Sequence, residues 1–442
     1  MQAGLSTKNA PSPKVVLPYY AYGAVAFIVA AIMMFFAADD LSSSYMTPKV
    51  LSVAHMLILG WVTMIIFGAL YQLIPVVMEV KLYSEKLAMA SFITLGLGTP
   101  MMAYSFWVNF IGASHAMMTG GGLVILSVIM FVANVFGSAI KTENKTIENR
   151  FIATSVVWLL LTVVLGLSIV LFPEILASGS FQIHIHIGII GWFMMLIVGV
   201  ASTLMPMFFI AHQLNKKCLE RAYWLINGGL VILVATMFLD LGNYAKIGAG
   251  VVILMGFMMF FKYNFGAYKK RLRRSLDIGM KLSVLAFSLF ALTMITGIIS
   301  SFGSIISNDF LPRINLIYGI SLIYGFITAL ILGQMYKTLP FIVWLKLYQD
   351  KVGKFKTPLP ADMHSEEAAQ AHYFFFIGGF ALLIAGVWFK ESILIQASAA
   401  FMLLTALLYG YNTYKILAHK QKLKPLVMPK MKPRPRPVVK KS

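Results

Sequence analysis

The sequence predicts an all-α integral membrane protein of about twelve transmembrane helices, arranged as three four-helix repeats. Three observations lead to this fold class. The 442 residues are 59% hydrophobic and only 12% charged, with a mean hydropathy of +0.82, a balance that soluble globular domains do not show. The apolar residues fall into runs long enough to cross a bilayer. One pattern of residues also recurs three times along the chain.

The apolar runs define the predicted spans. Each needs roughly 20 apolar residues, because a helix in lipid must satisfy its own backbone polar groups. We predict spans at 15–38, 48–78, 86–108, 114–139, 150–172, 181–211, 220–241, 246–268, 278–302, 312–346, 372–389 and 392–417. A polar leader, 1–14, precedes the first run, which is too long for a signal-peptide core, so we interpret this run as a retained helix.

The basic residues sort by side of the membrane. A formal charge of +20 could suit a nucleic acid, but with twelve spans all but four of the 36 Lys and Arg fall on one face. The four on the other face are Lys49, Lys246, Arg313 and Lys390. This positive-inside bias predicts a multi-pass protein of the inner (plasma) membrane, with both termini cytoplasmic. The expected partner is the lipid bilayer, and no nucleic acid is expected.

Two segments concentrate these cations. They are the loop Lys269–Arg274 and the tail 420–442, which we expect to be disordered. Attraction to anionic lipid headgroups explains both; docking of an acidic partner is the alternative. The single cysteine, Cys218, excludes an intramolecular disulfide framework and a cysteine-based metal cluster.

The recurring pattern divides the transmembrane domain, 15–419, into repeats at about 15–145, 146–277 and 278–419. It lies in the second, sixth and tenth helices, and its copies start 131 and then 134 residues apart. The copies read His55, Gly60, Trp61, Gly68, Tyr71 and Pro75; then His186, Gly191, Trp192, Gly199, Ser202 and Pro206; then Ile320, Gly325, Phe326, Gly333, Tyr336 and Pro340.

A helical wheel gives the pattern a physical meaning. At 100° per residue, the glycines, the Tyr or Ser and the proline form one stripe opposite the first position. Small residues on that stripe let a neighbouring helix approach closely, and the proline predicts a break near the cytoplasmic end. The histidine points elsewhere, and since lipid is a costly surrounding for it, we expect it to face the interior of its own repeat.

Four of the eight histidines lie near the predicted outer face: His55, His115, His184 and His186. The others, His212, His364, His372 and His419, fall at or beyond the cytoplasmic helix ends. Imidazoles at a common depth in an apolar medium suggest a heme or metal site, since neutral imidazole binds copper, zinc and heme iron. An interhelical hydrogen bond is the alternative, and we favour it for His115. His184 lies 200° around the helix from His186, so the two cannot share a ligand if that turn is regular.

These features resemble the catalytic subunit I of heme-copper oxidases: twelve helices, three four-helix arcs, and histidines near the outer ends of the second and sixth helices. His55 with Gly60 and Trp61, and His186 with Gly191, Trp192 and Pro206, carry the resemblance. It implies that His55 is a heme ligand and that His186 or His184 binds a metal. Twelve-helix heme- and copper-containing membrane proteins of nitric-oxide responses are also similar.

The chain departs from this family at the tenth helix. There the family supplies histidines to both hemes, whereas this helix has none and Ile320 stands at the repeat's histidine position. Residues 213–363 contain no histidine at all. The departures argue against a standard heme-copper binuclear centre and against ordinary cytochrome oxidase activity.

The sequence therefore supports a leading hypothesis and two alternatives. The first is an oxidase-like hemoprotein, an oxidoreductase or a sensor, for electron transfer in a respiratory chain or for O2 or NO. His55 would bind heme, with His186, His184 or His115 as a further iron or copper ligand, and an electron donor or another membrane subunit as partner. The second is a transporter or assembly factor for copper or a small solute. The third is a structural subunit that has lost its cofactors.

Overall fold

A computed structural model describes residues 9–44, 46–109, 114–174, 179–272, 275–302, 306, 309–421 and 423–426. Most of the predicted leader and tail, and Arg273 and Arg274 of the basic loop, lie outside these ranges. Helices make up the described fold, and its β-structure is limited to isolated bridges.

Twelve helices are long and apolar enough to cross a membrane, which confirms the predicted number of spans. Nine of them are single α-helices: α1 (Pro13–Phe36), α5 (Glu85–Trp107), α6 (His115–Ala139), α7 (Ile147–Leu171), α10 (Lys217–Phe238), α11 (Asn243–Lys269), α12 (Ile278–Ser301), α15 (Glu366–Phe389) and α16 (Ser392–Leu417). A short α2 (Ala38–Ser43) follows α1, and η6 (Pro360–Met363) precedes α15.

The other three spans are composite, with a π-helical segment inside each. The second comprises α3 (Pro48–His55), η2 (Met56–Thr63) and α4 (Met64–Val77). The sixth comprises α8 (Ser180–His186), η3 (Ile187–Met194) and α9 (Met195–Phe209). The tenth comprises α13 (Leu311–Ile320), η4 (Ser321–Ile327), α14 (Thr328–Tyr348) and the terminal turn η5 (Gln349–Lys351).

Predicted and observed boundaries agree within a few residues, except that the tenth span ends at Lys351 and the eleventh begins at Glu366. Ser365 explains the second difference. Its hydroxyl accepts a hydrogen bond from Ala368 N, so the helix begins at this cap, before the apolar residues start. Ser84, Ser114, Thr146 and Asp277 cap α5, α6, α7 and α12 in the same way.

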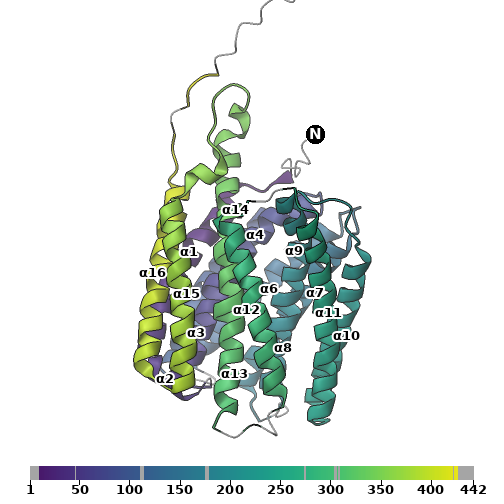
Figure 1. The fold of residues 1–442 in the computed structure, drawn as a ribbon, viewed down its shortest axis with the longest axis vertical. Helices are drawn as coiled ribbons and strands as arrows, with labels where there is room; N and C mark the ends of the chain where they lie inside the picture. The colour runs from purple at the N-terminus through teal and green to yellow at the C-terminus, as the bar shows by residue number, and fades with distance from the viewer. Residues whose placement is uncertain are drawn as a thin grey trace, which may run out of the picture.

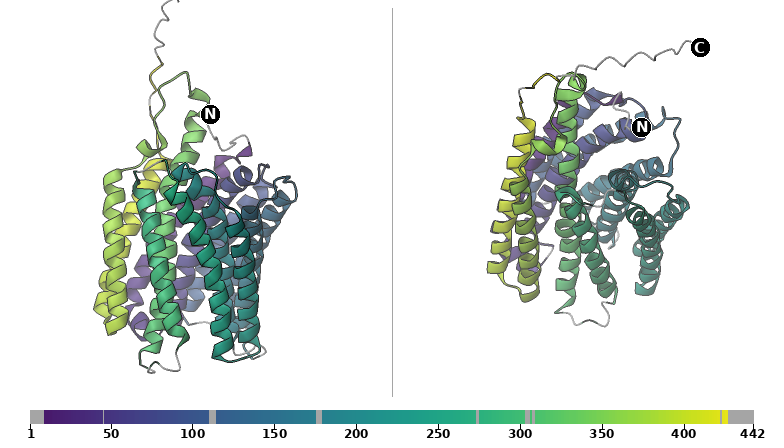
Figure 2. Two further views of the ribbon diagram at one scale, coloured as in Figure 1. Left: turned by 45° about the vertical axis from the view of Figure 1, so that its right-hand side comes forward. Right: turned by 45° about the horizontal axis from the view of Figure 1, so that its top comes forward.

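The three composite helices form the centre of the bundle. Between 72% and 78% of each apolar window is buried, against 22% to 56% for the other nine. Figure 1 and both views in Figure 2 show the helices packed side by side along one common direction. The central helices are therefore the elements that can enclose a site shielded from lipid.

Glycines bring each central helix against the helix that starts its predicted repeat. A Cβ on Gly68 would stand 2.6 Å from Tyr19 Cβ on α1, and one on Gly199 would stand 2.8 Å from Phe151 Cβ on α7. In the third copy, a Cβ on Gly333 would meet the Gly279 carbonyl oxygen of α12 at 2.6 Å. The close approach predicted for the glycine stripe is confirmed.

The predicted proline break is only partly right. Pro75 and Pro206 lie inside α4 and α9, within the last turn, and Pro340 lies well inside α14, which continues to Tyr348. The regular departure from α-geometry is instead the π-helical segment, which widens the turn near the middle of each central helix. A wheel drawn at 100° per residue therefore misplaces side chains beyond these segments.

The segment between α14 and α15 rises above the bundle at the end where the first described residues lie (Figure 1). It pairs with the chain after α16: Lys356 N donates to Lys424 O, and Leu426 N donates to Lys354 O, both at 3.0 Å. The start and the end of the described chain thus lie at the same end of the bundle.

Candidate functional site

The three composite helices share one local geometry at the matched positions. His55 is the last residue of α3, His186 the last of α8 and Ile320 the last of α13, and a π-helical segment follows each directly. Such segments are rare and often occur at functional sites. The sequence pattern thus marks a recurring change of helix geometry, and two of its three copies place an imidazole there.

A backbone carbonyl fixes the orientation of the His55 ring. Nδ1 lies 2.7 Å from the Leu51 carbonyl oxygen, one turn earlier. The ring also stacks on Phe106 of α5, with centroids 5.0 Å apart and planes inclined by 23°. As predicted, His55 is partly buried and faces a helix of its own repeat.

His186 repeats this arrangement in the sixth span. Its Nδ1 lies 2.8 Å from the Gln182 carbonyl oxygen, again one turn earlier. His184 instead reaches across to α7, where its Nδ1 lies 3.0 Å from Thr162 O. A Cβ on Gly166 would stand 2.6 Å from His184 Cε1, so the glycine provides the space for this imidazole.

These contacts determine the tautomer of all three rings. A carbonyl oxygen can only accept, so each Nδ1 carries the proton and donates it, and each Nε2 carries a lone pair. The described residues offer no hydrogen-bond partner to any of the three Nε2 atoms. Histidines that bind metals are commonly held by this kind of bond from the other ring nitrogen to a carbonyl.

The three imidazoles line one cavity of about 1340 Å³, larger than the roughly 300–1,000 Å³ of ordinary ligand pockets. The turn holding His184 and His186 is regular, as α8 shows, yet both rings reach this cavity. The cavity is wide enough to contact both sides of α8, and the expectation that the two histidines cannot share a ligand stays a prediction.

The lining is apolar with a few polar groups. Thr63 and Trp192, from two of the π-helical segments, line the cavity, and among the described residues their buried Oγ1 and Nε1 atoms have no hydrogen-bond partner. Tyr324, from the third segment, also lines the cavity, and its hydroxyl lies close to Gly379 of α15. Lys246 and Asn243 of α11 also line the cavity. Sequence reasoning missed Thr63 and Tyr324 as site residues. Lys246 could have been identified from the sequence, since it is one of four cations on the predicted outer face.

The remaining histidines lie elsewhere. His115 is exposed at the start of α6 and is not among the cavity residues, so its ligand role stays a prediction. Ile320 of the tenth span lines the cavity at the position where the other repeats carry histidine. Among the described residues, no group of three or more His, Cys, Asp or Glu side chains could hold a metal ion.

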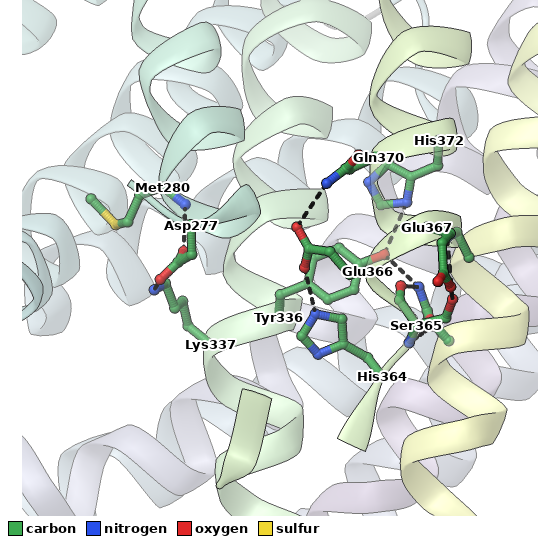
Figure 3. A network of polar contacts seen from close by, with 12 residues as sticks. Asp277, Met280, Tyr336, Lys337, His364, Ser365, Glu366, Glu367, Gln370 and His372 are labelled. Atoms are coloured by element: carbon green, nitrogen blue, oxygen red, sulfur yellow. Dashed lines mark hydrogen bonds and ion pairs between the residues drawn. The ribbon is translucent and has the colours of Figure 1, made fainter. Parts of the chain in front are cut away.

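A second polar network lies toward the opposite end of the bundle (Figure 3). Asn412 Nδ2 donates to Tyr336 OH at 3.0 Å, and Tyr336 OH lies 3.0 Å from His372 Nδ1. His364 packs on the other side of Tyr336, with ring centroids 4.8 Å apart, and its Nε2 lies 3.5 Å from Glu366. Nearby, Lys337 pairs with Asp277. These residues join α14, α15 and α16 and do not line the large cavity.

Comparison with known proteins finds likeness in structure. No family model matches the chain, and no curated protein does. Among solved structures, the chain is similar to a heme-copper terminal oxidase determined as a dimer by cryo-EM. Sequence identity is 11% and the TM-score is 0.47, and the match covers 93% of this chain and 85% of that one.

Proposed function

We propose that this chain is a membrane hemoprotein in which His55 is an axial heme ligand. One observation carries the proposal: three imidazoles, each with its Nε2 lone pair left free, line a single large apolar cavity. His186 or His184 supplies a further ligand to iron or copper. His115 is a further candidate ligand. Because it lies outside the cavity, it could bind only a group that extends beyond the cavity.

The surrounding residues suit such a group. Phe106 provides a flat aromatic face beside His55, and the cavity of about 1340 Å³ is large enough for a macrocycle. When bound, heme would supply one-electron chemistry and a coordination position for a diatomic gas. The protein's own contribution is to fix the imidazole tautomers and to exclude water.

The missing histidines define the kind of activity. The tenth span supplies no imidazole, and residues 213–363 contain none, so a binuclear centre of the standard kind lacks ligands. We therefore propose electron transfer, or metabolism or sensing of O2 or NO, in place of ordinary oxygen reduction. An electron donor or a further membrane subunit is part of this proposal, as is an inner-membrane location with both termini in the cytoplasm.

We also propose that the twelve spans form three four-helix repeats. Two features support it: the π-helical segments at the three matched positions, and a clamp that recurs in the first and third repeats. Asn134 binds the backbone of Ser84 through both its amide atoms. Asn412 binds the backbone of Ser365 in the same way.

Absorption spectroscopy of the purified protein tests the proposal. Protein expressed with ample heme should show a Soret band that is lost or shifted in His55→Ala and His186→Ala. His212→Ala removes an exposed loop histidine outside the cavity and should leave the spectrum unchanged. A colourless wild-type preparation would reject a heme site.

One feature favours the alternative, a carrier or assembly factor for copper. Eight cavity residues are methionines, whose thioethers suit Cu(I): Met34, Met46, Met102, Met117, Met194, Met237, Met294 and Met402. Metal and heme analysis of the same preparation distinguishes a hemoprotein, a copper carrier and a structural subunit. Copper without heme supports the carrier, and absence of both supports a structural subunit.

A further inference from the structure

A second cavity lies away from the histidines, where the second repeat differs from the other two. It encloses about 290 Å³ and is lined by Val76, Val77, Thr146, Glu148, Ser202, Thr203, Lys216 and Tyr263. Ser202 occupies the matched position at which the other repeats carry Tyr71 and Tyr336. The smaller side chain removes an aromatic ring from this end of the bundle.

The Tyr–Asn contact of the other two repeats has no counterpart among the described residues here. Tyr71 lies beside Asn134, and Tyr336 accepts a hydrogen bond from Asn412. Asn264 follows Ser202 by 62 residues, much as Asn134 follows Tyr71 by 63. Asn264 Nδ2 donates only within its own helix, to Phe260 O, and its buried Oδ1 has no partner. The second repeat has kept the asparagine and lost the contacts that close the site.

The cavity contains buried polar atoms without partners. Glu148 Oε1 pairs with Lys216 Nζ at 2.8 Å, but Oε2 of the same carboxylate has no partner, and the side chain is only 5% exposed. Ser202 is 2% exposed, and its hydroxyl has no partner. An unpaired buried carboxylate oxygen is costly, so a native protein is expected to satisfy it with a ligand, an ion or ordered water.

The unsatisfied atoms are all oxygens, which indicates the chemistry of the occupant. Glu148, Ser202 and Tyr263 line the cavity together, and Tyr263 OH is held beside Ser202 by its hydrogen bond to Ser202 O, at 3.3 Å. Oxygen donors of this kind suit hard cations, and the carboxylate repels an anion. Lys216 pairs with Oε1 of Glu148, so the second oxygen of the carboxylate remains available.

We propose that this cavity binds a small monovalent cation such as Na⁺ or K⁺, held by Glu148 Oε2 and the Ser202 hydroxyl. The site is separate from the histidine cavity, and its residues play no part in the heme proposal. The cation would stabilise the ends of α7 and α9, where the second repeat lacks the Tyr–Asn contact.

Thermal unfolding in detergent tests this inference, with NaCl, KCl and choline chloride compared at equal ionic strength. A bound cation stabilises the folded state by mass action. The wild type should therefore melt higher, by on the order of 2 °C or more, in Na⁺ or K⁺ than in choline, and the shift should saturate. Equal melting in all three salts would mean that the cavity holds only water, and would overturn the proposal.

Three variants assign the effect to the cavity. Glu148→Gln and Ser202→Tyr should abolish the difference between salts, the second by filling the cavity with the residue that the other repeats carry. Glu220→Gln, at an exposed acid in the first turn of α10, should retain it. A Glu148→Gln variant that keeps the full salt difference would exclude this site. Heme absorption is not part of the readout, so this result is independent of the proposed function.

Discussion

At the scale of single residues, backbone carbonyls prepare the three outer histidines. His55 and His186 each bond the carbonyl one turn earlier in the chain, whereas His184 uses Thr162 on a neighbouring helix. The first two therefore depend only on their own helix. His184 depends on how closely α8 packs against α7, and on Gly166 in particular.

Gly166→Ala tests this dependence. The added methyl group would stand 2.6 Å from His184 Cε1, so we expect the imidazole to move off the Thr162 carbonyl. Overpacking of this kind costs about 1–3 kcal/mol, so the melting temperature should fall. If His184 is a ligand, the cofactor spectrum should change as well. Gly122→Ala adds a methyl group with nothing within 4 Å and should affect neither quantity.

At the scale of helices, the network around Tyr336 joins α14, α15 and α16 at the end of the bundle opposite His55, His184 and His186. His364 lies between the transmembrane segments, and its side chain is 6% exposed. Burial lowers the pKa of His364, while the neighbouring Glu366 acts in the opposite direction. The folded protein therefore holds this imidazole neutral at pH values where the unfolded chain, with a pKa near 6.5, becomes protonated.

This difference predicts a pH dependence of stability. Because the unfolded state binds more protons below about pH 6.5, acidification favours unfolding. The melting temperature of the wild type should fall between about pH 7.5 and 5.5, and His364→Asn should reduce that fall. His212→Asn, at an exposed loop position, should keep the wild-type profile. Identical profiles for wild type and His364→Asn would show that another group is responsible.

The same scale shows what the sequence could predict and what it could not. Helix number and most ends followed from apolar runs, because lipid imposes a length on every span. The glycine stripe predicted the close approach of a neighbouring helix, and the structure identifies that helix as α1 for Gly68 and α7 for Gly199. The π-helical segments were not predicted, since no residue type specifies them. The helical wheel places His184 and His186 on different sides of the regular helix α8, and only the structure shows that one cavity is wide enough to contact both sides.

At the scale of the whole molecule, charge distribution and bundle geometry agree. The described chain starts and ends at the same end of the bundle, as an even number of spans requires. From the positive-inside bias we propose that this end is the cytoplasmic one. The matched positions of the three central helices differ in content: the first position carries a histidine in two of them and an isoleucine in the third, and Ser202 stands where the others carry Tyr71 and Tyr336.

Cys218 allows the orientation to be tested with the natural sequence. It lies at the start of α10, on the predicted cytoplasmic side, and is partly exposed. A membrane-impermeant maleimide should label it in inside-out vesicles and not in right-side-out vesicles. Tyr244→Cys in a Cys218→Ser background places a thiol at a 92% exposed position in the first turn of α11. This thiol should be labelled in right-side-out vesicles and not in inside-out vesicles. Labelling of Cys218 from outside would invert the proposed topology.

The central claim is that the free Nε2 atoms of the outer histidines bind a cofactor in their shared cavity. An experimental density map of the protein purified with its natural content tests it most directly. The account predicts flat, macrocycle-sized density in the cavity, joined at its centre to Nε2 of His55 or of a neighbouring imidazole. A cavity filled by acyl chains, with all three Nε2 atoms facing only lipid or water, would contradict it.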